Sequence, residues 1–307
     1  MEPLIVQWLR DRYPLSDVVR IGIGDDATLL DLSNAPRSVV TTDMLMDGVD
    51  FEVDRCGPSR VGRKALAVNL SDLAAMAARP VAALVSLALP RTADLEFVKS
   101  LYQAMESLAS EFDVTIAGGD TNCWDQPLVV SVTAIGQATA KGPLLRSGAV
   151  ADDEILVTGV FGGSILGHHF DFQPRVAEAL LLHKDFELHA GMDVSDGLSL
   201  DLARLAEASG CGAEVDLNLV PIASAAHALA ARDGESALQH ALSDGEDFEL
   251  ILAVPSETAR HLLAEQPLGI PLTRIGKFVV GAGLWQRRAS GDRIPLAPQG
   301  YLHGAGS

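Results

Sequence analysis

The 307-residue chain is poor in cysteine, in aromatic residues and in basic residues. Its three cysteines, Cys56, Cys123 and Cys211, are far apart and form no CxxC pair. This argues against a disulfide framework or a zinc site and fits a reducing compartment. Lysine and arginine number 23 against 41 acidic residues, for a net charge of −18. Because nucleic-acid phosphates require basic surfaces, we expect no nucleic-acid partner.

The sequence also lacks a long apolar run and a basic leader. The longest apolar run, Val81–Leu89, is about half the length that a membrane helix needs. The first residues, Met1-Glu2-Pro3-Leu4, do not resemble a signal peptide. We therefore expect a soluble, cytoplasmic protein with no membrane partner. Hydrophobic residues make up 48% of the chain and aromatic residues only 5%, so a core would be built mainly from aliphatic side chains.

Hydrophobic spacing and turn residues predict helices and strands that alternate in both halves of the chain. Helices are expected over 4–12, 59–78, 94–111, 198–209 and 256–265. Strands are expected over 39–42, 81–89, 114–117, 127–136, 154–158, 213–217, 247–254 and 273–280. Pro80 is expected to end the second helix, and the glycines of "VTIAGGDT" to form a turn after a strand. The alternation predicts an α/β (α+β) fold. A shift to small residues around 141–153 predicts the boundary between two domains, 1–140 and 150–307.

Aspartates in glycine turns or beside apolar runs are the main chemical signal. They are Asp25, Asp26, Asp43, Asp72, Asp120, Asp193 and Asp196. No basic residue stands directly beside them in the sequence, and converging carboxylates without a counterion require a cation. Oxygen ligands of this kind suit Mg²⁺ or Ca²⁺. Any one of these residues could instead cap a helix or form an Asx-turn, but no EF-hand pattern is present and together they favour a metal site.

Other segments allow both a binding and a structural interpretation. The chain contains no P-loop, protein-kinase or GxSxG motif. The glycine run 159–163 follows a predicted strand, so it could receive a phosphate at a helix N-terminus or be an ordinary turn. Arg146 could pair with a phosphate or form a surface ion pair. Glu246 and Asp247 follow a glycine and could belong to a binding loop or to an acidic turn.

Eight segments occur in a definite order between about residues 20 and 255: "GIGDDATLL", "VVTTDMLMDGVDF", "RKALAVNLSDLAAMAARP", "IAGGDT", "LLRSGA", "ILVTG", "DVSDGLSLDL" and "SDGEDFEL". Together they resemble the thiamine-monophosphate kinase family of the aminoimidazole-ribonucleotide-synthetase-like superfamily. The resemblance implies two α/β domains with the site between them, and a homodimer that pairs the N-terminal sheets. It implies direct transfer of the γ-phosphoryl group of ATP to thiamine monophosphate, assisted by several Mg²⁺ ions and without a dedicated catalytic side chain.

The resemblance also implies roles for matching positions. The metal ligands would be Asp26, Thr41, Thr42, Asp43, Asp72, Asp120 and Asp193, with Asp196 holding a further ion. The ATP contacts would be Gly119, Asp120, Arg146 and Ser195, with Phe112 in place of a tyrosine near the adenine. Glu246 would contact the substrate.

Two substrate positions depart from the family pattern. Asp50 stands where the family has a histidine that would touch the thiamine moiety. Pro298 stands where an aromatic residue would stack on the substrate ring, although Tyr301 nearby is retained. Two alternatives therefore stay open: a related phosphotransferase with a different acceptor, and a non-catalytic protein that binds Mg-nucleotide or thiamine phosphates.

Overall fold

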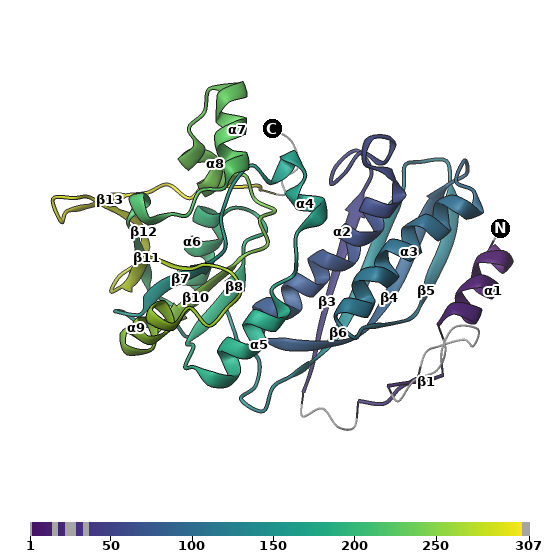
Figure 1. Cartoon of the computed structure of the whole chain (residues 1–307), viewed down its shortest axis with the longest axis horizontal. Helices are drawn as coiled ribbons and strands as arrows, with labels where there is room; N and C mark the ends of the chain where they lie inside the picture. The colour runs from purple at the N-terminus through teal and green to yellow at the C-terminus, as the bar shows by residue number, and fades with distance from the viewer. Residues whose placement is uncertain (1, 14–17, 22–28, 33–36, 303–307) are drawn as a thin grey trace. The chain divides into compact units, whose positions relative to one another are not determined.

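The computed structural model describes residues 2–13, 18–21, 29–32 and 37–302, which form two compact units (Figure 1). The first unit comprises Met1–Leu73 and Ala78–Pro143, and the second comprises Ala74–Ala77 and Leu144–Ser307. Each unit contains a β-sheet and helices, so the chain is a mixed α/β protein, as predicted. No helix among the described residues is both long enough and apolar enough to cross a bilayer.

The first unit is a four-stranded sheet with two long helices on one face (Figure 1). Its helices are α1 (Glu2–Arg12), α2 (Val53–Ala75) and α3 (Leu95–Glu111), and its strands are β1 (Val19–Ile21), β2 (Leu29–Leu30), β3 (Ser38–Met46), β4 (Ala78–Pro90), β5 (Thr115–Trp124) and β6 (Val129–Ala138). The main sheet has the order β3-β6-β4-β5, with only the β4–β5 pair parallel. Strands β3 and β5 are therefore its two edges.

Strand β3 separates a buried face from an exposed one. Val39 and Leu45 are each 8% exposed, whereas Val40 and Met44 are 62% and 61% exposed. Successive side chains of a strand point to opposite faces, so the odd-numbered residues face the side covered by helices. The even-numbered residues present an apolar surface that no described element of this unit covers.

The region around Pro80 differs from the prediction. Helix α2 ends at Ala75, and Pro80 lies inside strand β4 instead of ending the helix. A proline within a sheet lacks the N–H of a ladder hydrogen bond. Here pairing with β5 begins only at Ala82, and the register with β6 shifts between Pro80 and Ala82. The irregular pairing thus accommodates the missing donor.

The glycines of "VTIAGGDT" also differ from the prediction, because they continue strand β5 and do not form a turn. The φ of Gly119 is 155°, and a Cβ added there would lie 1.8 Å from the carbonyl oxygen of Val85 on β4. Only glycine allows two backbones to approach so closely. Gly119 is therefore required by the close approach of strands β4 and β5 and not by a turn.

The second unit is built around a seven-stranded sheet of order β13-β12-β9-β11-β7-β10-β8. The strands are β7 (Glu154–Thr158), β8 (Ala190–Asp193), β9 (Gly212–Val215), β10 (Leu250–Val254), β11 (Leu272–Val279), β12 (Gly283–Arg287) and β13 (Arg293–Pro295). The helices are α4 (His168–Asp171), α5 (Val176–Asp185), α6 (Leu198–Ala208), α7 (Ser224–Asp233), α8 (Ala237–Ser243) and α9 (Ser256–Glu265), with the 3₁₀ turns η1 (Ser164–Leu166) and η2 (Leu217–Leu219).

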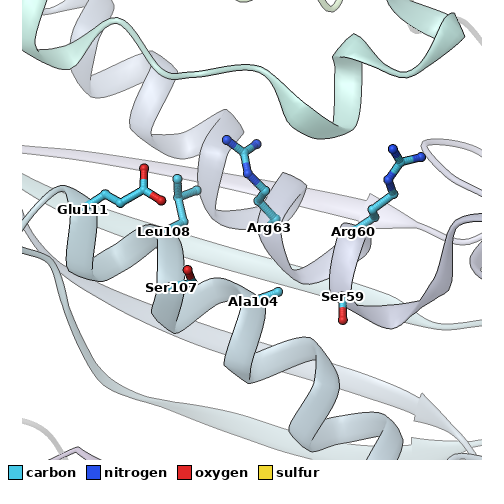
Figure 2. A pocket seen from close by; sticks show the side chains of 7 residues that line it. All are labelled: Ser59, Arg60, Arg63, Ala104, Ser107, Leu108 and Glu111. Atoms are coloured by element: carbon cyan, nitrogen blue, oxygen red, sulfur yellow. The ribbon is translucent and has the colours of Figure 1, made fainter.

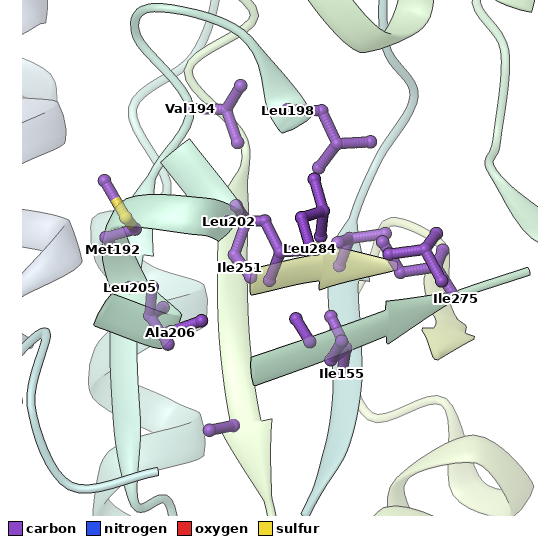
Figure 3. Packing of buried hydrophobic residues seen from close by; sticks show 14 of the residues in the cluster. Ile155, Met192, Val194, Leu198, Leu202, Leu205, Ala206, Ile251, Ile275 and Leu284 are labelled. Atoms are coloured by element: carbon purple, nitrogen blue, oxygen red, sulfur yellow. The ribbon is translucent and has the colours of Figure 1, made fainter. Parts of the chain in front are cut away.

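Helix α6 packs against the sheet and contributes to the hydrophobic core of this unit. Leu198, Leu202 and Leu205 recur at helical spacing and pack against sheet residues that include Ile155 and Ile251 (Figure 3). Helix α6 begins a short distance along the chain after strand β8 ends. The connecting segment, 194–197, carries two of the residues for which a binding role is predicted.

Candidate active site

A group of carboxylates lies where strand β3 meets helix α2 in the first unit. Thr41 and Asp43 are on the helix-facing side of β3, and the Thr41 hydroxyl donates a hydrogen bond to Asp72 on α2. Burial, together with the negative charges of Asp72 and Asp50, raises the pKa of Asp43 to about 6. The fold thus crowds three acids that are far apart in the sequence.

The chemistry of this group fits a divalent cation. A raised carboxylate pKa means that the ionised form is disfavoured, and a cation with oxygen ligands would remove that cost. Among the described residues, no three His, Cys, Asp or Glu side chains already converge tightly enough to hold a metal. Asp26 lies outside the described residues, and Asp193 and Asp196 belong to the second unit.

The structure separates Thr42 from this group. Its side chain is on the exposed face of β3, where its hydroxyl accepts a hydrogen bond from Thr133 at 3.0 Å and donates to the carbonyl of Val132 at 3.2 Å. The side chains of Thr42 and Asp43 therefore lie on opposite faces of β3, and the metal role of Thr42 stays a prediction. Adjacent residues in a strand point to opposite faces.

Asp120 lies at the other edge of the sheet. Asp120 on β5 is paired with Ser86 on β4, which is paired with Ser131 on β6. Ser131 is in turn paired with Met44 on β3, the residue that follows Asp43. Three interstrand spacings amount to about 14 Å between backbones. Asp120, Ser86 and Met44 are all exposed, on the face opposite Asp43. Within one chain, the predicted ligands Asp43 and Asp120 are therefore far apart.

Asp50 lies in a tightly bonded loop after β3. Its carboxylate accepts a hydrogen bond from the amide of Met46 at 2.7 Å, and its carbonyl accepts one from the Lys64 ammonium at 2.8 Å. Lys64 is on α2 and is completely buried. Lys64 is not among the residues predicted from sequence, although a lysine within the apolar run "KALAVNL" is a signal for a buried charge. The lysine fixes the backbone of the predicted substrate residue.

Phe112 follows helix α3 as its C-cap residue and is half-buried. Its amide donates a hydrogen bond to the carbonyl of Ala109 at 3.2 Å. The contact of Phe112 with adenine stays a prediction, and so does the role of Gly119 as an ATP contact.

A cavity of about 250 Å³ lies between α2 and α3 (Figure 2). Arg60 and Arg63 line it from α2, and Leu108 and Glu111 line it from α3. Its lining, as far as the described residues show, includes none of the residues predicted to bind ATP, metal or substrate. We therefore do not identify this cavity with the candidate active site.

In the second unit, one turn gathers three predicted groups. The carbonyl of Ser195 accepts a hydrogen bond from the amide of Glu246 at 2.7 Å, and the carbonyl of Asp196 accepts one from Tyr301 at 2.8 Å. Asp193 ends strand β8 just before this turn and is 2% exposed. The predicted ATP contact Ser195, the substrate contact Glu246 and the segment containing Pro298 are thereby held together.

The carboxylate of Asp196 has a basic partner in the fold. It forms an ion pair with Arg204 on α6, and the same Arg204 nitrogen lies 2.8 Å from Asp201. No basic residue is next to Asp196 in the sequence. Helix α6 places Arg204 beside Asp196 in the fold. Arg204 is shared by the two carboxylates and offsets part of their charge, so the electrostatic argument for a metal is weaker here than at Asp43, and the metal role of Asp196 stays a prediction.

The glycine run 159–163 does not form the phosphate site considered from sequence. The amide of Gly162 donates to Asp247 at 2.9 Å, and the amide of Gly163 donates to Asp244 at 2.7 Å. The helical turn that follows, η1, is only three residues long. Carboxylates of the same chain occupy these donors, so they are not available to a phosphate.

Arg146 lies on an exposed loop of the second unit. The Ser209 hydroxyl donates a hydrogen bond to the Arg146 carbonyl at 3.0 Å and accepts one from the amide of Ala149 at 3.1 Å. The loop backbone is thus anchored to the end of α6, while an exposed guanidinium is suited to bind a phosphate.

A buried ion pair supports the segment that carries Glu246. Arg175 donates to the carboxylate of Glu249 at 2.7 Å, and Thr158 donates to the same carboxylate at 2.6 Å. The two charged side chains are 13% and 3% exposed. We expect Arg175→Met to destabilise the protein by about 3 to 5 kcal/mol, because Glu249 would be left buried without its counterion.

Urea unfolding of the variant, monitored by circular dichroism, measures this loss. The matched control is Arg175→Met with Glu249→Met, which removes both charges and should recover most of the stability. An unchanged midpoint in the single variant, or no recovery in the double variant, would contradict the assignment of a stabilising pair.

Comparison with known families gives two matches that together span most of the chain. The model described as "AIR synthase related protein, N-terminal domain" matches residues 24–138. The model described as "AIR synthase related protein, C-terminal domain" matches residues 132–284. These matches confirm the predicted two-domain fold class.

Individual relatives are similar over nearly their whole length. The thiamine-monophosphate kinase of Rhodopirellula baltica is 44% identical over 311 residues, covering 99% of this chain and 98% of its own. The crystal structure of thiamine-monophosphate kinase from Stenotrophomonas maltophilia K279a is 35% identical, with a TM-score of 0.77 and coverage of 93% of this chain and 94% of its own.

A third relative is a solved structure of AaThiL complexed with AMPPCP and TMP. It is 26% identical, with a TM-score of 0.78, and covers 99% of this chain and 96% of its own. The family models, the similarity of fold and the identity over nearly the whole chain lead to the same assignment. The chain belongs to the thiamine-monophosphate kinase family of AIR synthase related proteins.

Proposed function

We propose that this chain is an ATP-dependent thiamine-phosphate kinase. It would transfer the γ-phosphoryl group of ATP directly to the phosphate of thiamine monophosphate, giving thiamine diphosphate and ADP. The observation that carries the proposal is 44% identity to a thiamine-monophosphate kinase over 99% of the chain. The AaThiL complex with AMPPCP and TMP supports the same pair of substrates here.

We propose that residues 1–140 form the metal-binding and dimerisation domain, and that residues 150–307 complete the site. Thr41, Asp43 and Asp72 would hold Mg²⁺, which when bound neutralises and orients phosphate oxygens. Arg146 and Ser195 would bind and orient ATP. The acceptor phosphate is already largely ionised near neutral pH, so the reaction needs no strong general base from the protein. Positioning and charge stabilisation would then supply the catalysis.

The acceptor side would be formed by Asp50, Glu246 and the segment around Pro298. A carboxylate at Asp50 can attract the cationic thiazolium ring through its charge. Glu246 has a φ of 53°, which is unusual for a residue other than glycine, so the surrounding bonds must hold its backbone. The bonds that hold Glu246 to Ser195 would place the acceptor contact beside the nucleotide contact.

A coupled assay of ADP release, with thiamine diphosphate identified in the product, tests the function. With saturating ATP and Mg²⁺, we expect thiamine monophosphate to support turnover and other phosphate monoesters to support much less. ADP release only with another acceptor would favour the phosphotransferase of altered specificity. Binding of ATP without any ADP release would favour the non-catalytic alternative and overturn the proposal.

We further propose a homodimer formed through the face of the first sheet that lies opposite helices α2 and α3. Exposed apolar residues on this face include Val40 and Met44 of β3, and burying such a patch favours association. The predicted ligand Asp120 is also exposed on this face. It is on edge strand β5, whereas β3, which carries Asp43, is the other edge strand. Because Asp43 is on the edge strand β3 and Asp120 on the other edge strand, β5, we propose that the β5 edge of one protomer meets the β3 edge of the other, so that Asp120 completes the partner's site.

A further inference from the structure

Asp201 forms an unusually dense set of hydrogen bonds at the start of helix α6. One oxygen of its carboxylate, Oδ2, accepts bonds from three consecutive amides, those of Ser195, Asp196 and Gly197, at 3.1, 2.9 and 3.1 Å. The other oxygen, Oδ1, accepts a bond from Arg204 at 2.8 Å. Asp201 is 0% exposed. A buried carboxylate with this many charge-assisted bonds strongly restricts the backbone around it.

The turn that Asp201 holds is also the point where the predicted binding residues meet. The amides of Ser195 and Asp196 bind Asp201, while their carbonyls bind the amides of Glu246 and Tyr301. Movement of this turn would therefore displace both the nucleotide contact and the acceptor contact. Asp201 itself is buried beneath the turn and is not exposed to a ligand.

We propose that Asp201 is a positioning residue that fixes the Ser195–Gly197 turn for nucleotide binding, with Arg204 as its counterion. This inference rests on the proposed function for the role of Ser195. Asp201 acts by removing alternative conformations of the turn, so that ATP binds a preorganised backbone. Loss of the carboxylate should therefore weaken nucleotide binding more than it disturbs the rest of the fold.

The substitution Asp201→Asn tests the charge while keeping the size. An asparagine oxygen can still accept amide hydrogen bonds, but its NH₂ group would face the donor of Arg204. We expect the dissociation constant for AMPPCP with Mg²⁺, measured by calorimetry, to rise about tenfold. The KM for ATP should rise in parallel, with a smaller change in kcat. Asp201→Ala, which removes every acceptor, should show a larger effect.

A matched control separates positioning from general stability. Asp216 in the same unit also accepts a backbone bond, from the amide of Asn218 at 3.0 Å, but the element that it caps is η2. Asp216→Ala should lower the unfolding temperature and leave the affinity for AMPPCP within about twofold. If Asp201→Ala does not fold, Asp201→Asn decides the question.

The inference is overturned if Asp201→Asn binds AMPPCP as tightly as the parent protein, or if Asp216→Ala weakens binding to the same extent. Because calorimetry measures nucleotide binding without turnover, this result does not depend on the acceptor. Failure of the parent protein to phosphorylate thiamine monophosphate would reject the proposed function and leave the Asp201 comparison valid.

Discussion

Asp43→Asn is expected to lower turnover by about a thousandfold while making the metal-free protein more stable at neutral pH. The loss of turnover follows from the proposed role of Asp43 as a magnesium ligand. The gain in stability follows from crowding, because burial and the charges of Asp72 and Asp50 raise the pKa of Asp43 to about 6. One substitution should thus move activity and stability in opposite directions.

The sign of the pH dependence follows from the raised pKa. Below the unfolded-state pKa, Asp43 is protonated in both states and has no net effect. As pH rises toward 6, the unfolded state loses the proton first, so native stability falls; above 6 the full cost, roughly 2 to 3 kcal/mol, is present. Asparagine carries no such cost. The advantage of Asp43→Asn should therefore appear between pH 4 and 6 and persist at pH 8.

Thermal and urea unfolding in EDTA, at several pH values, measure this difference. Addition of Mg²⁺ should stabilise the parent protein more than the variant, because a bound cation lowers the cost of ionising Asp43. Asp11→Asn, at an exposed position of helix α1, is the matched control and should change neither activity nor pH dependence. Full activity in Asp43→Asn, or lower metal-free stability at pH 8, would count against the proposed metal site.

Mixed dimers of two inactive variants are expected to recover activity. Asp43→Asn and Asp120→Asn should each be inactive as homodimers. If Asp120 completes the partner's site, a mixed dimer contains one site with both mutations and one intact site. Random exchange of equal amounts makes half of the dimers mixed, so we expect about a quarter of the parent activity.

The experiment requires subunit exchange, followed by mass spectrometry of differently tagged chains and light scattering to establish a dimer. A mixture of Asp43→Asn with Asp72→Asn is the control, because Asp72 lies beside Thr41 in the same protomer. That mixture should stay inactive, since every site then carries a mutation. Recovery in the control but not in the test mixture, or a monomeric parent protein, would refute the shared site.

Several features of the fold were predictable because they depend on neighbours in the sequence. The helix expected over 256–265 is α9, and that expected over 94–111 begins after its N-cap, Asp94. The ordered motifs identify the family for the same reason: each is a short segment with its own pattern. The identities of the predicted site residues also came from such segments, including Asp43 within "TTD".

The arrangement of those residues was decided only by tertiary structure. Asp43 and Asp72 become neighbours because a strand packs against a helix, which raises a pKa that no local pattern reveals. Asp120 is separated from them by the strand order, and Asp196 gains Arg204 through helix α6. Gly119 permits close strand contact where the sequence suggested a turn. Local sequence determines which groups are present, whereas charge pairing and burial depend on long-range packing.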